Sequence, residues 1–323
     1  MDRRTCLGWA CGAAVAPWTV GRAAAQGAFP SRTVTIVVPY ATGGPTDMHA
    51  RALAPRLSEA WGQPVIVENR GGAGTMIGTQ AVAKAAPDGH TLLYTSYAFT
   101  SNPVLRRQLP YDPASLAPLL HTGTGTLMLL MSGASRFRTL REVIEHARSA
   151  PGALKLASSG NASSPHIAAA LFARAIGAEI THVPYRGAGP SVADVMAGVC
   201  DGTFDGTSNL PNMQAGRLRP VGTAADARHL LVPDVPTFRE QGVDLVFGNW
   251  YGFFAPGATP EPVQRRIEAD LRAALADPKA REPIVRSGLR LAEGSRTDFA
   301  AFLKREAARL QGLVDSGATI SVD

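Results

Sequence analysis

The sequence has 323 residues, of which 45% are hydrophobic and 18% charged, and its formal net charge is +6. This apolar fraction supports buried cores and excludes a disordered or collagen-like chain, while the length favours about two domains. After residue 25 no apolar run approaches the roughly 20 residues of a membrane-spanning helix, so we expect a chain that does not itself span a membrane.

The first 25 residues have the pattern of a secretory signal peptide. They begin with the basic pair Arg3 and Arg4, continue with a mostly apolar stretch, and end in three alanines at Ala25. A basic start, a short apolar segment and a small-residue ending are typical of a cleaved leader. The paired arginines fit the twin-arginine route, and the choice between it and the general secretory route stays open. We therefore predict export to the periplasm with cleavage near Ala25.

Removal of the leader changes both the charge and the cysteine content. Three arginines and one aspartate would leave, which lowers the net charge from +6 to +4 over 298 residues. So small a surplus, screened over about 8 Å at physiological salt, argues against nucleic-acid binding. Cys200 would remain as a lone thiol, which excludes an internal disulfide, and we interpret it as a packed residue rather than a nucleophile.

Apolar runs alternate with helical periodicities along the rest of the chain. Short apolar runs between turns predict strands at 33–38, 65–67, 91–94, 127–131, 154–157 and 180–183. Apolar residues that recur every three or four positions predict helices at 45–61, 76–85, 140–148, 165–176, 192–197, 263–275 and 299–314. This alternation predicts an α/β fold with largely parallel sheets that are covered on both faces.

The chain has no long linker, although its length favours two domains. Two segments without helical punctuation, 121–130 and 246–252, are predicted to cross between domains. Two crossings imply that the middle third is inserted into a domain built from both ends. We predict one lobe from residues 26–125 with 249–323 and a second lobe from residues 126–248, closing over a central cleft.

One strand–turn–helix unit occurs twice and carries the functional hypothesis. The first turn, 40–44, leads into a helix that opens with Pro45, and the second, 158–164, leads into a helix that opens with Pro165. Proline suits the first helical position, and glycine in a turn lets the backbone approach a ligand closely. Each unit leaves free N–H groups and a positive helix end at the carboxyl edge of a strand. If the units face each other, they would hold a small carboxylate from both sides.

Side chains must add to the helix dipoles. A dipole contributes at most about 2 kcal/mol, whereas micromolar binding needs about 8 kcal/mol. Charge-assisted hydrogen bonds of roughly 1.5–3 kcal/mol each could supply the difference. The turns contain hydroxyl and amide residues of this kind: Thr42, Thr46, Ser158, Ser159, Asn161 and Ser163. The alternative is that they only cap helices and stabilise turns.

Asp47 introduces a negative charge into the first turn of a helix that is predicted to bind an anion. One interpretation is a favourable interaction with the helix dipole. The other is that Asp47 holds an ordered water or a hydroxyl or amino group of the ligand, which would restrict the acids that fit.

Several motifs occur in order from Phe29 to the carboxyl end, among them Gly43-Gly44 with Asp47 and the Ser-Ser-Gly-Asn sequence at 158–161. The complete set is 38–47, 62–70, 83–89, 109–112, 157–161, 182–187, 233–237 and 250–252. Together they closely resemble the tripartite tricarboxylate transporter substrate-binding proteins, also called Bug-type receptors. The resemblance implies a periplasmic receptor of the periplasmic-binding-protein type II fold. It also implies that the receptor binds a small carboxylate between the turns at 40–47 and 158–164 and delivers it to a membrane permease or a sensor.

Some positions depart from the usual pattern of these receptors. Thr42 stands where proline or alanine is common, and His90 replaces the usual tyrosine. Tyr97-Ala98-Phe99 makes a cleft-edge loop bulkier and more aromatic. The identity of the ligand therefore cannot be taken from the resemblance, and an aromatic or a smaller acid stays open.

The candidate ligand-binding residues are Tyr40, Thr42, Gly43, Gly44, Thr46, Asp47, Ser96, Tyr97, Ser158, Ser159, Asn161, Ser163, His166, Tyr185 and Asp205. No cofactor, metal or catalytic residue is predicted, and the protein is expected to act as a monomer. The glycines of 72–78 only superficially resemble a dinucleotide fingerprint, because the third comes one residue late. The alternative function is an exported α/β hydrolase or lyase using Ser159 with His166 or Asp205, although the sequence lacks a nucleophile elbow.

Overall fold

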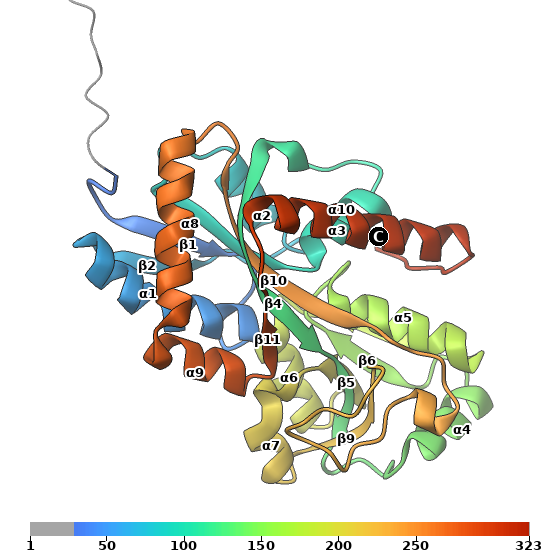
Figure 1. The fold of residues 1–323 in the computed structure, drawn as a ribbon. Coiled ribbons are helices and arrows are strands. Elements are labelled where there is room, and N and C mark those ends of the chain that lie inside the picture. Colours follow the sequence, from blue (N-terminus) through green and yellow to red (C-terminus); the bar gives the residue numbers. More distant parts are fainter. Residues whose placement is uncertain (1–28, 323) are drawn as a thin grey trace, which may run out of the picture.

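The computed structural model of the protein describes residues 29–322 (Figure 1). The predicted signal peptide of residues 1–25 lies outside these residues. The described chain folds into two α/β lobes, each built around one mixed β-sheet. The predicted α/β fold class with two lobes is therefore confirmed.

The first sheet has the strand order β11-β4-β10-β3-β1-β2. Its strands are β1 (Val34–Val38), β2 (Val65–Asn69), β3 (Thr91–Ser96), β4 (Leu116–Thr126), β10 (Gly248–Pro256) and β11 (Leu289–Leu291). Strand β1 pairs in parallel with β2 and β3, whereas β10 is antiparallel to both β3 and β4. The carboxyl ends of β1 and β3 consequently lie at the same edge of the sheet.

The second sheet has the order β7-β6-β8-β5-β9. Its strands are β5 (Met128–Ser132), β6 (Lys155–Ser158), β7 (Thr181–Pro184), β8 (Gly202–Asp205) and β9 (Leu218–Thr223). Strand β6 is parallel to β7 and β8, and β5 is antiparallel to β8 and β9. Both sheets are thus mixed, and the expectation of largely parallel sheets is wrong, because the strands that cross between the lobes run against their neighbours.

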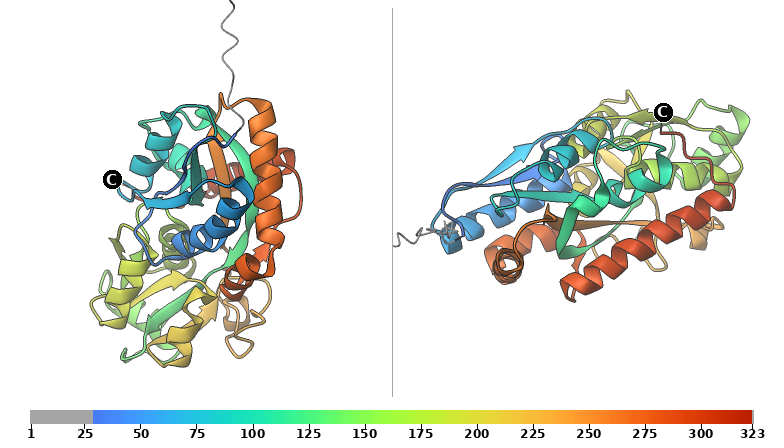
Figure 2. Two further views of the ribbon diagram at one scale, coloured as in Figure 1. Left: turned by 90° about the vertical axis from the view of Figure 1, so that its left-hand side faces the viewer. Right: turned by 90° about the horizontal axis from the view of Figure 1, so that it is seen from above.

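Helices cover both faces of the first sheet (Figure 2). One face packs against α1 (Pro45–Trp61), α8 (Glu261–Ala276) and α9 (Pro278–Arg286), and the other against α2 (Met76–Ala83), α3 (Ala98–Leu105) and α10 (Arg296–Asp315). Strand β1 shows why helices must cover both faces. Val34, Ile36 and Val38 are buried on the face covered by α1, α8 and α9, whereas Val37 is buried on the face covered by α2, α3 and α10. A strand that is apolar on both sides requires a cover on each.

The second sheet is covered in the same way. Helices α4 (Leu140–Ser149) and α5 (Ser164–Ile176) share a core with Leu129 and Leu156, whereas α6 (Ala188–Met196) packs against Met128 and Leu130. A short helix, α7 (Leu210–Gln214), precedes β9.

The lobes are joined through two neighbouring strands. Strand β4 continues through Leu127 into β5 of the second sheet, and β10 returns beside it with Gly248 opposite Thr126 (Figure 1). Strands that lie before 127 or after 247 belong to the first sheet, and those between belong to the second. The lobe limits given from the sequence, 125/126 and 248/249, stay a prediction about which residues move together.

One segment differs from the sequence-based prediction. The expected aromatic loop at 97–99 is instead the start of α3, because Phe99 packs on Phe254 with ring centroids 4.2 Å apart and fixes this segment against the sheet. Helices α7 and α9 and strands β9 and β11 are among the elements that were not predicted. Among residues 29–322, no helix is both long and apolar enough to cross a bilayer.

Candidate functional site

A small hollow lies between the lobes, where the turn before α1 meets the turn before α5. Its lining residues come from both lobes and from the crossing strands: Tyr40, Gly44, Pro45, Thr46, Asp47, Ser96, Leu127, Ser159, Ser164, Pro165, Ala188, Asp205, Asn249 and Tyr251. A second hollow shares five of these residues and adds His49 and Ser208. Their volumes of about 30 and 20 Å³ hold one or two waters each, so the lobes are closed on one another.

The closed state is held by direct backbone contact between the lobes. We call this contact the closure seam, formed by residues 41–44 of the first lobe and residues 186–189 of the second. The Ala41 N–H donates a hydrogen bond to the Arg186 carbonyl over 2.8 Å. A β-carbon on Gly187 would lie 2.8 Å from the Ala41 nitrogen, closer than side-chain carbons approach other atoms. Glycine is required here because the two backbones touch.

The wall from the first lobe is the N-terminus of α1. Its N-cap residue, Gly44, has no side chain to cap the helix, so the first N–H groups are free to meet a ligand. Thr46 is buried and lines the hollow. The Asp47 carboxylate accepts from the Gly43 N–H at 3.0 Å and from Arg51 Nε at 2.9 Å. Asp47 is therefore held by the turn and by Arg51, which supports a local role for its charge.

Tyr40 and Ser96 of the first lobe also line the hollow. The Tyr40 and Ser96 hydroxyl groups lie 2.7 Å apart in a buried hydrogen bond. Burial raises the pKa of Tyr40 to about 12, so the phenol stays neutral and can donate.

The wall from the second lobe is the N-terminus of α5. Ser163 is its N-cap, yet the Ser163 hydroxyl donates to the Gly160 carbonyl at 2.6 Å and does not cap the helix. The hydroxyl of Ser164 is buried without a hydrogen-bond partner in the described part of the chain. Ser159 also lines the hollow. Two uncapped helix ends with free hydroxyl groups thus face one hollow from opposite lobes, which suits an anion.

Asp205 places a second carboxylate in this hollow, at the end of β8. It is 6% exposed, and its Oδ1 accepts a hydrogen bond from the Gly206 N–H over 2.7 Å. Burial raises its pKa to about 6 despite that hydrogen bond. The pKa of Tyr251 is raised well above its usual value. Burial is the main cause, and the negative charge of Asp205 is the second.

Five of the predicted site residues do not line the hollow. Thr42 and Gly43 are exposed, and the Tyr97 ring packs on Phe247 with centroids 5.0 Å apart. Ser158 Oγ lies 2.6 Å from His182 Nε2 and also accepts from the Gly160 N–H. Ser163 serves the turn as described above. Whether any of them contacts a ligand stays a prediction.

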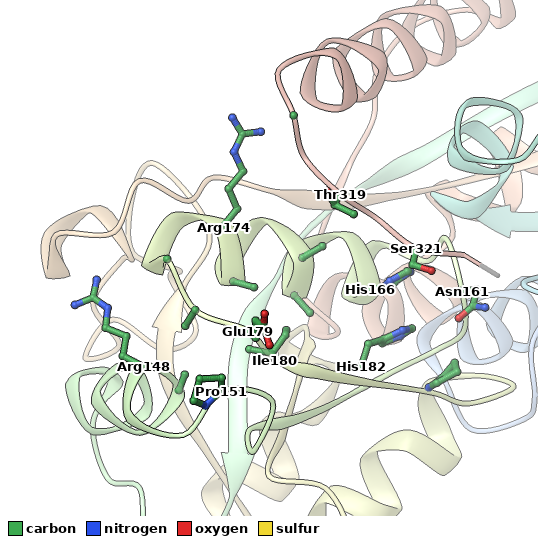
Figure 3. Close-up of a pocket in the computed structure, with 18 residues that line it drawn as sticks. Arg148, Pro151, Asn161, His166, Arg174, Glu179, Ile180, His182, Thr319 and Ser321 are labelled. Atoms are coloured by element: carbon green, nitrogen blue, oxygen red, sulfur yellow. The ribbon is translucent and has the colours of Figure 1, made fainter.

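Three further predicted residues lie away from the hollow. Tyr185 donates to Asp194 over 2.6 Å, while Asn161 and His166 line a large open hollow of about 1010 Å³ on the outer side of the second lobe. Figure 3 shows Asn161, His166 and His182 together at one end of this hollow, beside the C-terminal segment. Size therefore does not identify the ligand site, because this surface lies outside the cleft and the two helix ends do not converge on it.

His166 has a structural role that its sequence position did not suggest. Its ring stacks on His182 with centroids 3.7 Å apart and planes 6° apart. The Ala162 N–H donates to His166 Nδ1 at 3.1 Å. Burial lowers the pKa of His166 to about 3 and that of His182 to about 4, so both rings are neutral near pH 7. The two stacked rings thus hold the turn that leads into α5, His182 through the Ser158 hydroxyl and His166 through the Ala162 N–H.

Sequence reasoning missed half of the lining. Ser164, Asn249 and Tyr251 are polar examples, and the others are Pro45, Leu127, Pro165 and Ala188. The segment 246–252 was predicted only as a crossing strand, and the fact that a crossing strand must border the cleft was the signal available for Asn249 and Tyr251.

Two chemical questions raised by the sequence have structural answers. Cys200 is buried and free. Within residues 29–322, no group of three or more His, Cys, Asp or Glu side chains is arranged to hold a metal ion. In the same residues, Ser159 forms no hydrogen bond with His166 or Asp205, the pairing that the hydrolase alternative needs: the Nδ1 of His166 is occupied by the Ala162 N–H.

Comparison with known proteins identifies close relatives. Residues 49–318 match the family described as the tripartite tricarboxylate transporter family receptor. The UPF0065 protein of the tcbD–tcbE intergenic region of Pseudomonas sp. strain P51 is 38% identical, covering 91% of this chain and 88% of its own length. The solved structure of the periplasmic binding protein BugD has a TM-score of 0.85 at 30% identity, covering 90% of this chain and 99% of its own. MatC from Rhodopseudomonas palustris with bound malate has a TM-score of 0.83 at 32% identity, covering 88% and 100%.

Proposed function

The chain belongs to the tripartite tricarboxylate transporter receptor family, and we propose that it is a periplasmic receptor that captures a small carboxylate between its two lobes. The family consists of binding proteins, so the hydrolase or lyase alternative is set aside. The observation that carries the proposal is the convergence of two uncapped helix N-termini, at Gly44 and Ser163, on one hollow.

The hollow fits this role in its chemistry and in its closed form. Helix N-termini and free hydroxyl groups, such as those of Thr46 and Ser164, are donors that stabilise a carboxylate. The hollow at the two helix ends holds only one or two waters here, so a ligand enters with the lobes apart, and the lobes then close on it with the helix ends on either side. The relative MatC, which holds malate, supports a carboxylate of a few carbons.

Closure requires two bodies and a hinge. We assign residues 26–125 with 249–323 to one lobe and residues 126–248 to the other, with the hinge in the paired strands β4 and β10. The pairing of Gly248 with Thr126 supports this assignment, because both connections then bend at the same place.

The closed, loaded receptor would be presented to a membrane permease or a sensor. This step follows from the family, whose members are described as transporter receptors. The predicted leader of residues 1–25 supports delivery to the periplasm, and we expect a monomer, since a single chain supplies both walls of the hollow.

The experiment is a thermal-shift screen of the purified mature protein with mono-, di- and tricarboxylates, together with mass spectrometry of any ligand released on denaturation. We expect at least one small carboxylate to raise the melting temperature, and NMR to show that this acid remains unchanged. A screen in which no carboxylate raises the melting temperature contradicts the proposal. Time-dependent conversion of the acid would instead favour an enzyme.

A further inference from the structure

The side chains that line the two hollows carry negative charge, although a site that binds only a carboxylate would be expected to carry positive charge. The lining residues of the two hollows include two carboxylates, Asp47 and Asp205, and neither lysine nor arginine. His49 is the remaining basic residue of this lining, and burial lowers its pKa to about 3, so that it is neutral. The positive groups available to a ligand are therefore the partial charges of the helix ends.

The two carboxylates differ in how they are compensated. Asp47 pairs with Arg51, whose Nε lies 2.9 Å from Oδ1. Asp205 forms no ion pair within the described chain, and its partners are neutral: the Gly206 N–H and the side-chain amide of Asn209. Burial without a cationic partner disfavours its charged form. The site thus holds one acceptor whose charge the protein leaves unpaired.

Asp205 lines the first hollow together with the two helix ends, and it also lines the second hollow. Thr46, Ser164 and Pro165, which mark the helix ends, line the first hollow, whereas Asp205 lines both hollows together with Tyr251. A bound molecule that extends from the helix ends toward the second hollow therefore meets donors at one end and the Asp205 carboxylate at the other.

We propose that the ligand is an amino carboxylate, whose carboxylate lies at the two helix N-termini and whose ammonium group pairs with Asp205. A carboxylate without an amino group would bring a second negative charge to a buried, unpaired one. A hydroxyl would satisfy Asp205 as an acceptor but leave its charge uncompensated, whereas an ammonium group satisfies both. This inference rests on the proposed function and makes Asp205 the residue that determines ligand class.

The test uses pairs of acids that differ only by the amino group: aspartate and succinate, glutamate and glutarate, alanine and propionate. Affinities are measured by isothermal titration calorimetry at pH 8. For the pair that binds, we expect the amino acid to bind at least tenfold more tightly than its partner. In Asp205→Asn this preference should fall at least tenfold. Asp234→Asn, which removes an exposed carboxylate and the same unit of charge, should keep the wild-type preference.

A second measurement needs no variant and so does not depend on the folding of Asp205→Asn. The wild-type preference for the amino member should decrease as the pH falls from 8 to 5, because Asp205 becomes protonated over this range. The other titratable groups that face Asp205 are Asp47, Tyr40, Tyr251 and His49. The two tyrosines and His49 do not change charge between pH 8 and 5, because burial moves their pKa values outside that range.

The outcomes separate this inference from the proposed function. If the acids without an amino group bind as tightly as their partners, or if the preference does not change between pH 8 and 5, the amino carboxylate inference is overturned while the receptor function stands. If no member of any pair and no other carboxylate binds, both fail.

Discussion

A β-carbon added to Gly189 would lie 2.5 Å from the carbonyl oxygen of Thr42. The two residues lie in opposite lobes, so under the proposed closure they separate when the cleft opens. Gly189 lies in the first turn of α6, so alanine suits its backbone and clashes only across the closure seam.

We therefore expect Gly189→Ala to weaken binding selectively. Overpacking costs about 1–3 kcal/mol, which corresponds to roughly a 5- to 150-fold loss of affinity if it falls on the closed state alone. The melting temperature of the empty protein should stay the same or rise, because alanine favours the helix. Calorimetric titration and thermal unfolding of the empty protein check the two halves of the prediction.

Gly312→Ala is the matched control for this substitution. Gly312 also lies in a helix, α10, and a β-carbon there would meet no atom within 4 Å. This variant should gain about 0.5–1 kcal/mol of stability and keep its affinity. Equal affinities for Gly189→Ala and the wild type would show that the seam does not control binding.

The hydroxyl groups of Thr46 and Ser159 line the hollow, whereas Thr42 is exposed. Loss of a hydrogen bond to a charged ligand costs about 1.5–3 kcal/mol, so Thr46→Ala and Ser159→Ala should each reduce affinity roughly 10- to 150-fold. Thr42→Ala, in the same turn as Thr46, should leave the affinity within about twofold. If Thr42→Ala weakened binding as much as the others, the ligand would have to contact the outer part of the turn.

The stacked histidines predict a loss of stability in acid. In the folded protein their pKa values are lowered to about 3 and 4, so the unfolded chain binds protons more readily than the folded one below about pH 6.5. The stabilisation is complete above pH 6.5 and declines as the pH falls toward 4. His182→Gln should reduce this decline by up to about 1.4 kcal/mol per pH unit.

Urea unfolding at pH 7, 6, 5 and 4 measures this effect for each variant. The readout is the slope of stability with pH. The absolute stability of His182→Gln at pH 7 is not used, because the substitution also removes the partner of Ser158. Parallel slopes for wild type and His182→Gln would contradict the prediction.

Asn161 was predicted to bind ligand, yet its Nδ2 donates to the Val322 carbonyl over 3.0 Å. This contact ties the C-terminal segment, which follows α10 of the first lobe, to the turn before α5 of the second lobe. Asn161→Ala and truncation after Gly317 should each weaken ligand binding by a similar factor, because both release the same link across the closed lobes. Combined, they should cost less than the product of the two factors. Multiplicative losses would show that Asn161 acts independently of the C-terminal segment.

The sequence predicted those elements that are fixed by interactions between residues close together in the chain. The turn at 40–44 with Pro45 indicated the start of α1, since proline and glycine act on their own backbone. Phe99 was placed in a loop, because the contact with Phe254 that fixes α3 joins residues 155 positions apart. Long-range packing of this kind overrides local propensity.

The same distinction applies to the site. Thr46 and Ser159 were identified from turns, and both line the hollow. Ser158 and Ser159 are equivalent by residue type, but neighbours at a strand end point to opposite sides, and Ser158 turns toward His182. The stacking of His166 on His182 could not be predicted, because it depends on the pairing of β6 with β7.

Because the closure seam and the hollow are formed largely by different residues, binding strength and ligand selectivity could evolve, or be engineered, separately. Because the lobes meet there through main-chain atoms and an alanine methyl, closing them immobilises no long side chain. A methyl group added at Gly187 or Gly189, neither of which lines the hollow, would therefore adjust the strength of binding without changing a lining residue. A biosensor built on this scaffold could have its working concentration range set at the seam and its selectivity set separately in the hollow.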